Sequence, residues 1–268
     1  MLLGEICNFE LKIYKLTIIT NYMVFFCFSS KDRQAIVESL LYHLDDYCIP
    51  VWYDRRTMLM SDQRNYKNFV EGVGSCRYAV IILSPNCIAS KCANEEIELI
   101  KEKYKKGDMI VFPIFFNISA EDIPENYQWM RKLVYKELTP SIDSVAAAIH
   151  VVCKVLLDEL DKYPIKTLNE YIATYEKIPL HTYPIIIIQS YLTTYKGNYN
   201  ARISLLYSIC KYIISLYDIS NIPQYYYQGI NHLFSQTKLS LPVENRELLI
   251  MERSFLLLIN SVMFGVVL

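Results

Sequence analysis

Four short, continuously apolar segments in the first part of this chain constrain its fold more than any other feature. They are Val24–Phe28, Ile49–Tyr53, Tyr78–Leu83 and Met109–Phe116. Apolar runs of this length indicate strands that are buried on both faces. Segments with the apolar spacing of helices lie between and after them, at 32–47, 63–73, 90–106 and 141–160. This alternation predicts an α/β fold with a parallel sheet covered by helices on both faces.

The scarcity of glycine limits how such a fold can hold a nucleotide. The chain has seven glycines, and no set of them spells GxxxxGK[ST] or GxGxxG. A Walker-type loop and a standard Rossmann phosphate turn are therefore excluded. Ligands of open α/β sheets bind outside the carboxyl ends of the strands. The segments to consider for a site are thus 29–33, 54–62, 84–92 and 117–122.

The composition changes near Asp161–Pro164, which suggests a domain boundary. Residues 23–161 carry a net charge of −4 and residues 162–268 a net charge of +3, and 13 of the 23 tyrosines lie in the second part. Helical patterns at 185–195, 201–217 and 247–262 occur there without intervening strands. We expect an α/β domain at 23–161 and a small, Tyr-rich all-α domain of unknown role at 162–268. Residues 1–22 are expected to be an N-terminal extension, with Met23 as the natural start.

Charge, cysteine usage and hydropathy exclude several classes of partner. The formal net charge of −1 argues against nucleic acid as the main partner. The eight cysteines form no CxxC pair and lie far from the four histidines in sequence, so we expect no metal site and reduced thiols in the cytoplasm. The apolar run Phe255–Leu268 has about 14 residues, short of the roughly 20 that a membrane span needs. A buried last helix, with no stable membrane span, is the expectation.

Three neighbouring glutamates lie on the segment 90–106, where Ser90 suits the N-cap and Gly107 the stop of a helix. At about 100° per residue, Glu95 and Glu98 point roughly 140° or more from the apolar stripe and should be solvated. Glu96 lies about 70° from the stripe, at its edge, and Cys92 lies one turn earlier on the same side. A half-buried carboxylate near strand ends is a candidate catalytic group, and the alternative is an ordinary solvated surface charge.

Three segments, considered together, resemble the Toll/interleukin-1 receptor (TIR) domain family of bacterial type. They are 25–33 (FFCFSSKDR), 52–84 and 84–100, and 111–123 resembles the next strand and loop of the family. The resemblance covers about residues 23–160. It implies a flavodoxin-like fold of five parallel strands, and many such domains cleave NAD at the nicotinamide–ribose bond. The family's catalytic glutamate lies in an S-x-x-x-x-x-E pattern, which Ser90 and Glu96 match.

Other candidate substrate-binding residues follow from their positions. Phe28 ends the first strand and is placed to pack on a base, with ordinary core packing as the alternative. Ser29 and Ser30 offer hydroxyl and backbone N–H groups at the start of a helix, a suitable place for phosphate oxygens. Asp62 follows the loop that often gates the pocket in the family.

Ser90 and Cys92 complete the substrate-binding set, and two positions depart from the family pattern. Cys92 stands where bacterial relatives commonly have a tryptophan that stacks on the substrate. Ser61 stands where the gating loop usually has a glycine. The first change removes a stacking surface, and the second is expected to stiffen the loop. A nucleophilic role for the Cys92 thiol is disfavoured, because no base is evident nearby in the sequence.

The leading hypothesis is an NAD+ glycohydrolase or cyclase that acts in bacterial antiphage defence or signalling. NAD+ is then the substrate, and no cofactor is expected. Expected partners are a second copy bound through the TIR domain and a downstream effector that senses the product. The alternative is a non-catalytic TIR–TIR interaction module, which the departures at Ser61 and Cys92 favour. A phospho-accepting receiver domain is excluded, because Ser29–Ser30 and Ser84 stand where a receiver has acidic residues.

Overall fold

The computed structural model describes residues 22–140, 144–163, 166–220, 222–241, 243 and 245–264. The expected N-terminal extension lies outside the described residues, except for Tyr22. Contacts within the chain cluster into two compact units. Unit 1 comprises the described residues up to Asp32 together with Pro50–Glu137, and unit 2 comprises Arg33–Ile49 and the described residues from Leu138 on. The domain boundary near Asp161 stays a prediction.

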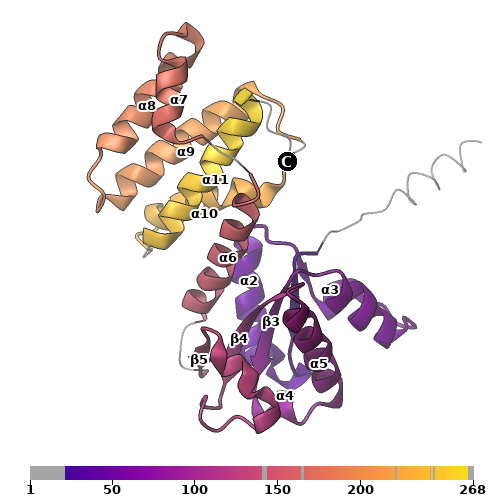
Figure 1. Ribbon diagram of the computed structural model, residues 1–268. Coiled ribbons are helices and arrows are strands. Elements are labelled where there is room, and N and C mark those ends of the chain that lie inside the picture. The colour runs from indigo at the N-terminus through magenta and orange to yellow at the C-terminus, as the bar shows by residue number, and fades with distance from the viewer. Residues whose placement is uncertain are drawn as a thin grey trace, which may run out of the picture. The chain divides into compact units, whose positions relative to one another are not determined.

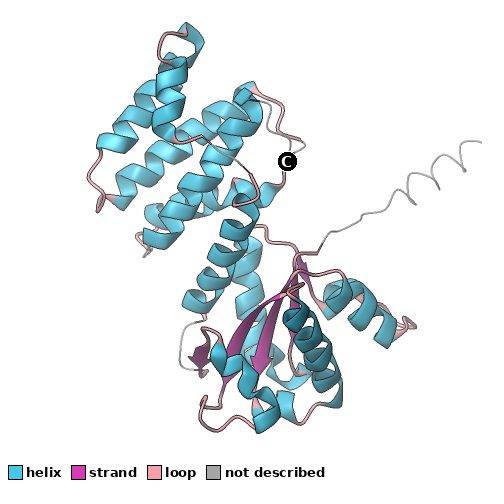
Figure 2. Cartoon of the chain, in the orientation of Figure 1, coloured by secondary structure: helices cyan, strands magenta, loops and turns pink. Residues whose placement is uncertain are grey.

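Unit 1 is built on a five-stranded sheet with the strand order β2-β1-β3-β4-β5 (Figures 1 and 2). The pairs β1–β2, β1–β3 and β3–β4 are parallel, and Val24 of β1 lies opposite both Val51 and Tyr78. This arrangement confirms the five-stranded parallel sheet that the resemblance implied. The strands are β1 (Val24–Cys27), β2 (Val51–Trp52), β3 (Tyr78–Leu83), β4 (Ile110–Phe116) and β5 (Lys136–Leu138).

The helix that follows β3 in unit 1 packs on alternate residues of the central strands, as the period of two in a strand requires. Ala93, Ile97 and Ile100 of this helix, α5 (Lys91–Lys106), share a buried apolar cluster with Phe25, Cys27, Ala79, Ile81 and Leu83. Figure 1 shows α5 running beside the sheet. The other helical segments of the unit are η1 (Ser30–Asp32), α3 (Asp54–Thr57), η3 (Tyr66–Gly74), α4 (Pro85–Ile88) and η4 (Glu125–Lys132).

The segment η3 corrects one expectation. The spacing of Tyr66, Phe69, Val70 and Val73 within 63–73 predicts that these apolar residues share one face of an α-helix, but Tyr66 and Val70 are exposed. The buried residues are Asn68, Gly72 and Val73, because η3 is a π-helix. Its backbone bonds join residues five apart, which moves the inward face away from the α-helical positions. The result is that a polar residue, Asn68, points into the unit.

Two features hold η3 in place against its neighbours. A Cβ at Gly72 would lie 2.6 Å from Phe25 and 3.2 Å from Trp52, so only glycine permits this close approach of η3 to the sheet. The ammonium of Lys103 on α5 donates hydrogen bonds to the carbonyls of Val73 (2.8 Å), Gly74 (2.8 Å) and Cys76 (2.9 Å). These bonds satisfy carbonyls at the end of η3, where a helix leaves its acceptors unpaired.

Unit 2 is helical, which confirms the expectation of a helical C-terminal region. Phe255 and the run Leu257–Ile259 of its last helix, α11, are fully buried. Among the described residues no helix is both long and apolar enough to cross a membrane. The helical segments are η2 (Arg33–Val37), α2 (Glu38–Asp46), α6 (Val145–Leu160), α7 (Leu168–Tyr175), η5 (Pro179–His181), α8 (Thr182–Thr193), α9 (Tyr199–Leu216), η6 (Gln224–Tyr226), α10 (Gln228–Lys238) and α11 (Asn245–Phe264).

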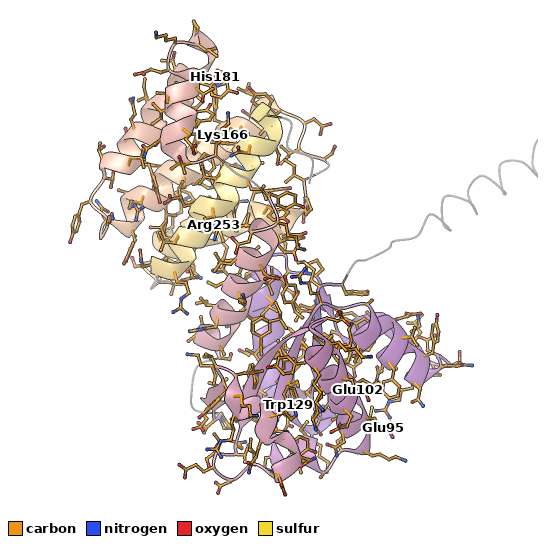
Figure 3. All side chains as sticks on the ribbon, viewed as in Figure 1. Glu95, Glu102, Trp129, Lys166, His181 and Arg253 are labelled. Carbon is orange, nitrogen blue, oxygen red and sulfur yellow. The ribbon has the colours of Figure 1, made fainter. Side chains whose placement is uncertain are left out.

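Tyrosine rings in unit 2 pack against its helices, and their hydroxyls form hydrogen bonds with polar side chains. Tyr171 shares a 2.9 Å hydrogen bond with His181, which Figure 3 labels beside α7, and Tyr191 donates to Glu252 at 2.5 Å. Tyr47 donates to the buried carboxylate of Glu247. Such partners are expected for buried phenols, since an unpaired buried hydroxyl is costly.

Candidate active site

The helix α5 places its three glutamates as the helical period predicts. Ser90 caps the helix, its hydroxyl accepting the amide of Ala93 at 3.4 Å, and Gly107 ends it with a left-handed φ of 80°. Glu95 and Glu98 are exposed, whereas the side chain of Glu96 lies on the buried face and is 5% exposed. The helix therefore directs one carboxylate, that of Glu96, into unit 1.

Two side chains, one on η3 and one on α5, donate hydrogen bonds to the Glu96 carboxylate. The amide nitrogen Nδ2 of Asn68 on η3 donates to Glu96 Oε1 at 2.7 Å, and the Cys92 thiol donates to the same oxygen at 3.4 Å. Asn68 Nδ2 also lies 3.6 Å from Cys92 Sγ. The structure thus brings together two predicted residues, Glu96 and Cys92, and adds Asn68, which the sequence did not single out.

The environment of Glu96 favours its protonated form. Burial raises the pKa of Glu96 to about 7, and the negative charge of Asp54 adds to this rise. Hydrogen bonds from the Cys27 and Cys92 thiols and the positive charge of Arg64 oppose it. A carboxyl group with such a pKa changes charge near neutral pH, which is characteristic of catalytic acids and bases.

The thiols beside Glu96 are protonated at neutral pH. Burial and the Glu96 charge raise the pKa of Cys92 to about 11, and burial raises the pKa of Cys27 well above its ordinary value. Cys27 donates from Sγ to the carbonyl of Ala93 at 3.6 Å. A thiol that stays protonated is a hydrogen-bond donor rather than a nucleophile. The arrangement therefore supports donor roles for both cysteines.

The residues at the end of β1 make their hydrogen bonds locally. Ser29 is buried and its hydroxyl accepts the amide of Lys31 at 3.4 Å, whereas Ser30 is exposed. The ring of Phe28 is half-buried, and its centroid lies 6.0 Å from that of Tyr53. The substrate-binding roles of Phe28, Ser29 and Ser30 stay predictions.

A buried carboxylate that the sequence did not single out, Asp32, lies next to the end of β1. It accepts hydrogen bonds from the Ser84 hydroxyl at 2.5 Å and from Asn86 Nδ2 at 2.7 Å. Ser84 in turn caps α4 by accepting the amide of Cys87 at 2.9 Å. The signal that could have indicated this cluster is a polar residue in the segment after each of two adjacent strands, Asp32 in η1 after β1 and Ser84 directly after β3. Asp32 ties the end of β1 to the end of β3.

The loop before Asp62 contains a tight turn. The amide of Asp62 donates to the carbonyl of Leu59 at 3.2 Å, and the Asp62 carboxylate accepts the amide of Leu59 at 2.7 Å. Ser61 has a left-handed φ of 78°, which a type II turn requires at its third residue and which glycine adopts without strain. The position where the family usually has glycine is therefore one where serine is strained.

We expect Ser61→Val to lower the free energy of unfolding by about 1–2 kcal/mol, because a β-branched side chain opposes a left-handed φ. Ser61→Gly should leave it unchanged within about 0.5 kcal/mol, since relief of strain is offset by the greater entropy of the unfolded chain. Urea unfolding followed by tryptophan fluorescence measures both, as Trp52 and Trp129 are the two tryptophans and both lie in unit 1. Ser75→Gly is the control, because Ser75 has an ordinary φ of −86° and should lose stability. Equal losses for the two glycine variants would contradict the strain at Ser61.

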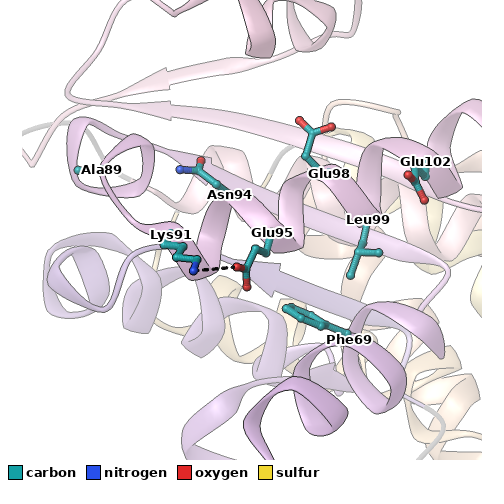
Figure 4. Close-up of a pocket in the computed structure, with 8 residues that line it drawn as sticks. All are labelled: Phe69, Ala89, Lys91, Asn94, Glu95, Glu98, Leu99 and Glu102. Atoms are coloured by element: carbon teal, nitrogen blue, oxygen red, sulfur yellow. Dashed lines mark ion pairs between the residues drawn. The ribbon is translucent and has the colours of Figure 1, made fainter.

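A groove of about 780 Å³ lies along the outer side of α5 and contains none of the predicted site residues (Figure 4). Its acidic side chains are exposed, and Lys91 lies 4.0 Å from Glu95 in an ordinary surface ion pair. We place the candidate site at Glu96 instead, because Glu96 is buried, hydrogen-bonded and shifted in pKa. The groove is lined by Phe69, Ala89, Lys91, Asn94, Glu95, Glu98, Leu99 and Glu102.

Known proteins are similar to this chain over the segment that contains Glu96. The family model described as TIR domain matches residues 24–150. NAD(+) hydrolase TcpA of Theionarchaea archaeon is 26% identical over 104 residues, and NAD(+) hydrolase TcpC of Escherichia coli is 28% identical over 105 residues. These alignments cover 38% and 39% of this chain.

A third relative is similar over a longer segment. The 2′ cyclic ADP-D-ribose synthase AbTIR of Acinetobacter baumannii is 24% identical over 138 residues, which is 52% of this chain. The chain spans 31%, 34% and 50% of the lengths of TcpA, TcpC and AbTIR. With the five-stranded sheet in the order 2-1-3-4-5, these matches identify residues 24–150 as a TIR domain with archaeal and bacterial relatives.

Proposed function

We propose that this TIR domain cleaves NAD+ at the nicotinamide–ribose bond and that Glu96 is its catalytic residue. The observation that carries the proposal is the buried Glu96 carboxylate on α5, which has a pKa of about 7 and accepts a hydrogen bond from Asn68 on η3. The names of the relatives, two NAD(+) hydrolases and a 2′ cyclic ADP-D-ribose synthase, support the same substrate. A sugar reaches Glu96 only after neighbouring side chains move, because the carboxylate is almost fully buried.

The proposed reaction needs little from the protein beyond a well-placed negative charge. The bond between the ribose carbon and the nicotinamide nitrogen breaks, and its electron pair goes to the nitrogen, so that neutral nicotinamide leaves. The sugar then carries oxocarbenium-like positive charge, which the ionised Glu96 carboxylate stabilises. Water completes the reaction to ADP-ribose with release of a proton, or a hydroxyl of the same molecule closes a cyclic product.

The remaining predicted residues are assigned as part of this proposal. Phe28 packs against a base, and Ser29 and Ser30 receive phosphate oxygens. Asp62 belongs to the gating loop. Ser90 sets the start of the helix that carries Glu96, a role its capping bond supports. Cys92 donates to Glu96 and offers no aromatic surface to the substrate.

The direct test is incubation of the purified chain with NAD+ and measurement of free nicotinamide and ADP-ribose products by chromatography. The proposal expects nicotinamide to appear in a quantity equal to the NAD+ lost. It also expects the rate per chain to rise with protein concentration if assembly activates the domain. No release at any protein concentration, from folded protein, would contradict the enzymatic function.

A second candidate function, self-association without catalysis, is favoured by the turn that precedes Asp62. Leu59 is 79% exposed and Met60 is 98% exposed, so two adjacent apolar side chains lie open to solvent. Exposed apolar groups on a loop tip are suited to contact with another protein surface. This function and catalysis are compatible, and the nicotinamide assay separates them.

We expect the double substitution Leu59→Ser with Met60→Ser to weaken self-association by about tenfold, because it removes most of the apolar area at this tip. Sedimentation equilibrium over a range of protein concentrations gives the association constant. Val134→Ser is the matched control, because Val134 is 88% exposed in a different loop of unit 1. If both variants associate like the wild type, the loop tip is not the contact.

The cellular setting is part of the same proposal. We place the protein in the cytoplasm, in bacterial antiphage defence or signalling, with a downstream effector that senses the product. Residues 162–268 are then the module that senses the trigger or controls assembly of the domain at 23–161. A truncation after residue 161 tests whether NAD+ cleavage loses its regulation.

A further inference from the structure

Asn68 is a buried polar side chain whose hydrogen-bonding capacity is only half used. It is 5% exposed, and its Nδ2 donates to Glu96 Oε1 at 2.7 Å. Its carbonyl oxygen Oδ1 is buried and has no hydrogen-bond partner among the described residues. An unpaired buried carbonyl costs about 1–3 kcal/mol, so natural proteins seldom keep one without a reason.

The orientation of this amide follows from its partner. When Glu96 is ionised, as catalysis requires, its carboxylate only accepts hydrogen bonds, so the NH₂ group of Asn68 faces Glu96 and the carbonyl oxygen faces away. Asn68 and Cys92 both donate to the same oxygen, Oε1. Asn68 Oδ1 is therefore a buried acceptor without a donor among the described residues, one amide group away from the Glu96 carboxylate.

We propose that Asn68 positions Glu96 and that its Oδ1 accepts a hydrogen bond from a hydroxyl of the nicotinamide ribose when the sugar binds at Glu96. This inference rests on the proposed function, since it names the part of the substrate that Asn68 recognises. A ribose held at the Glu96 carboxylate brings its hydroxyl donors to within one amide group of this acceptor. Binding of the ribose would satisfy the carbonyl that is unpaired in the free protein.

The groups that face Glu96 come from β1, α3, α5 and the residues just before η3, and they affect any measurement of its pH dependence. Cys27 of β1 and Cys92 of α5 donate toward the carboxylate, Arg64 before η3 adds positive charge, and Asp54 of α3 adds negative charge. Asn68 carries no charge itself, so its removal changes Glu96 only through the lost donor. That donor favours the ionised carboxylate, and its loss should raise the pKa of Glu96 further.

The first experiment measures Glu96 without any substrate. The full chain is labelled with ¹³C-glutamate, and the Glu96 signal is assigned by its absence in Glu96→Gln. Asn68→Ala should then raise the pH at which the Glu96 carboxyl titrates by about one unit. Asn65→Ala, the same change at an exposed position of this segment, should leave the titration unchanged. An unchanged titration in Asn68→Ala would overturn the positioning role. A shift seen in a protein that does not cleave NAD+ would leave positioning intact and refute the proposed function.

The second experiment tests recognition of the ribose. With NAD+ and two analogues that each lack one hydroxyl of the nicotinamide ribose, the wild type should prefer NAD+ in kcat/KM. Asn68→Ala should lower kcat with NAD+ by about 10- to 100-fold and should lose about tenfold of the discrimination against one analogue. Asn65→Ala should keep both. If Asn68→Ala discriminates as the wild type does while NAD+ is cleaved, Oδ1 does not contact the sugar, and the recognition part of the proposal fails.

Discussion

Glu96→Gln should lower the rate of nicotinamide release from NAD+ by about 10³-fold or more, at unchanged helix content. The substitution keeps the size of the side chain and its contact with Asn68, but it removes the charge that stabilises an oxocarbenium-like transition state. In the wild type, kcat/KM should fall tenfold for each pH unit below about 7, because only the ionised form of Glu96 stabilises positive charge and its pKa is about 7.

The matched control for this loss is Glu95→Gln, one residue earlier on α5. Glu95 is exposed and makes only a 4.0 Å ion pair with Lys91, so its replacement should leave the rate within about twofold. Nicotinamide release is measured by chromatography at several pH values, and circular dichroism checks the fold. A Glu96→Gln protein that keeps its full rate would place the catalytic group elsewhere in the chain.

The same substitution, Glu96→Gln, should stabilise unit 1 at pH 8 by about 3 kcal/mol. The pKa of Glu96 rises from its ordinary value of 4.5 to about 7 on folding, and each pH unit of this difference is worth about 1.4 kcal/mol. Between pH 4.5 and 7 the folded state holds a proton that the unfolded state has lost. Stability from this group is therefore present at low pH and is lost as the pH rises to about 7. A glutamine side chain does not titrate, so Glu96→Gln does not lose this stability as the pH rises.

Urea unfolding at pH 5 and pH 8, followed by the fluorescence of Trp52 and Trp129, measures this difference within unit 1. The gain from Glu96→Gln should be small at pH 5 and near its full size at pH 8, whereas Glu95→Gln should show no such dependence. A gain that is equal at both pH values would mean that Glu96 titrates in the folded protein as it does in the unfolded chain. The two Glu96 predictions together describe a residue that costs stability and supplies function.

Glu96 itself could be predicted from the sequence, because the information lies within one helix. The spacing of Ala93, Ile97 and Ile100 defines the buried face of α5, and Glu96 is the glutamate nearest to that face. Burial of this side chain and exposure of Glu95 and Glu98 agree with that simple periodicity. Strands β1 to β4 could be predicted in the same way, since a continuous apolar run is a local signal, whereas the short β5 contains Lys136 and Glu137 and gives no such signal.

Asn68 could not be found in the same way, for two physical reasons. An α-helical period assigns the inward face of 63–73 to apolar residues, and the π-helical winding of η3 brings Asn68 inward instead. Its partner is 28 residues away, and the two meet because Gly72 permits a close approach to the sheet and Lys103 binds the end of η3 to α5. The buried position of Asp32 could not be predicted for a similar reason, because its partner Ser84 is 52 residues away in the chain, at the end of β3.

The sequence by itself determined most elements of unit 1: which segments form four of the five strands, where α5 begins and ends, and which glutamate it buries. These follow from periodic burial and capping, which act between residues a few positions apart. The tertiary structure alone decided what surrounds that glutamate, namely the Asn68 donor, the protonated thiols and the raised pKa. Desolvation and hydrogen bonding at Glu96 depend on segments that are distant in the chain and adjacent only after folding.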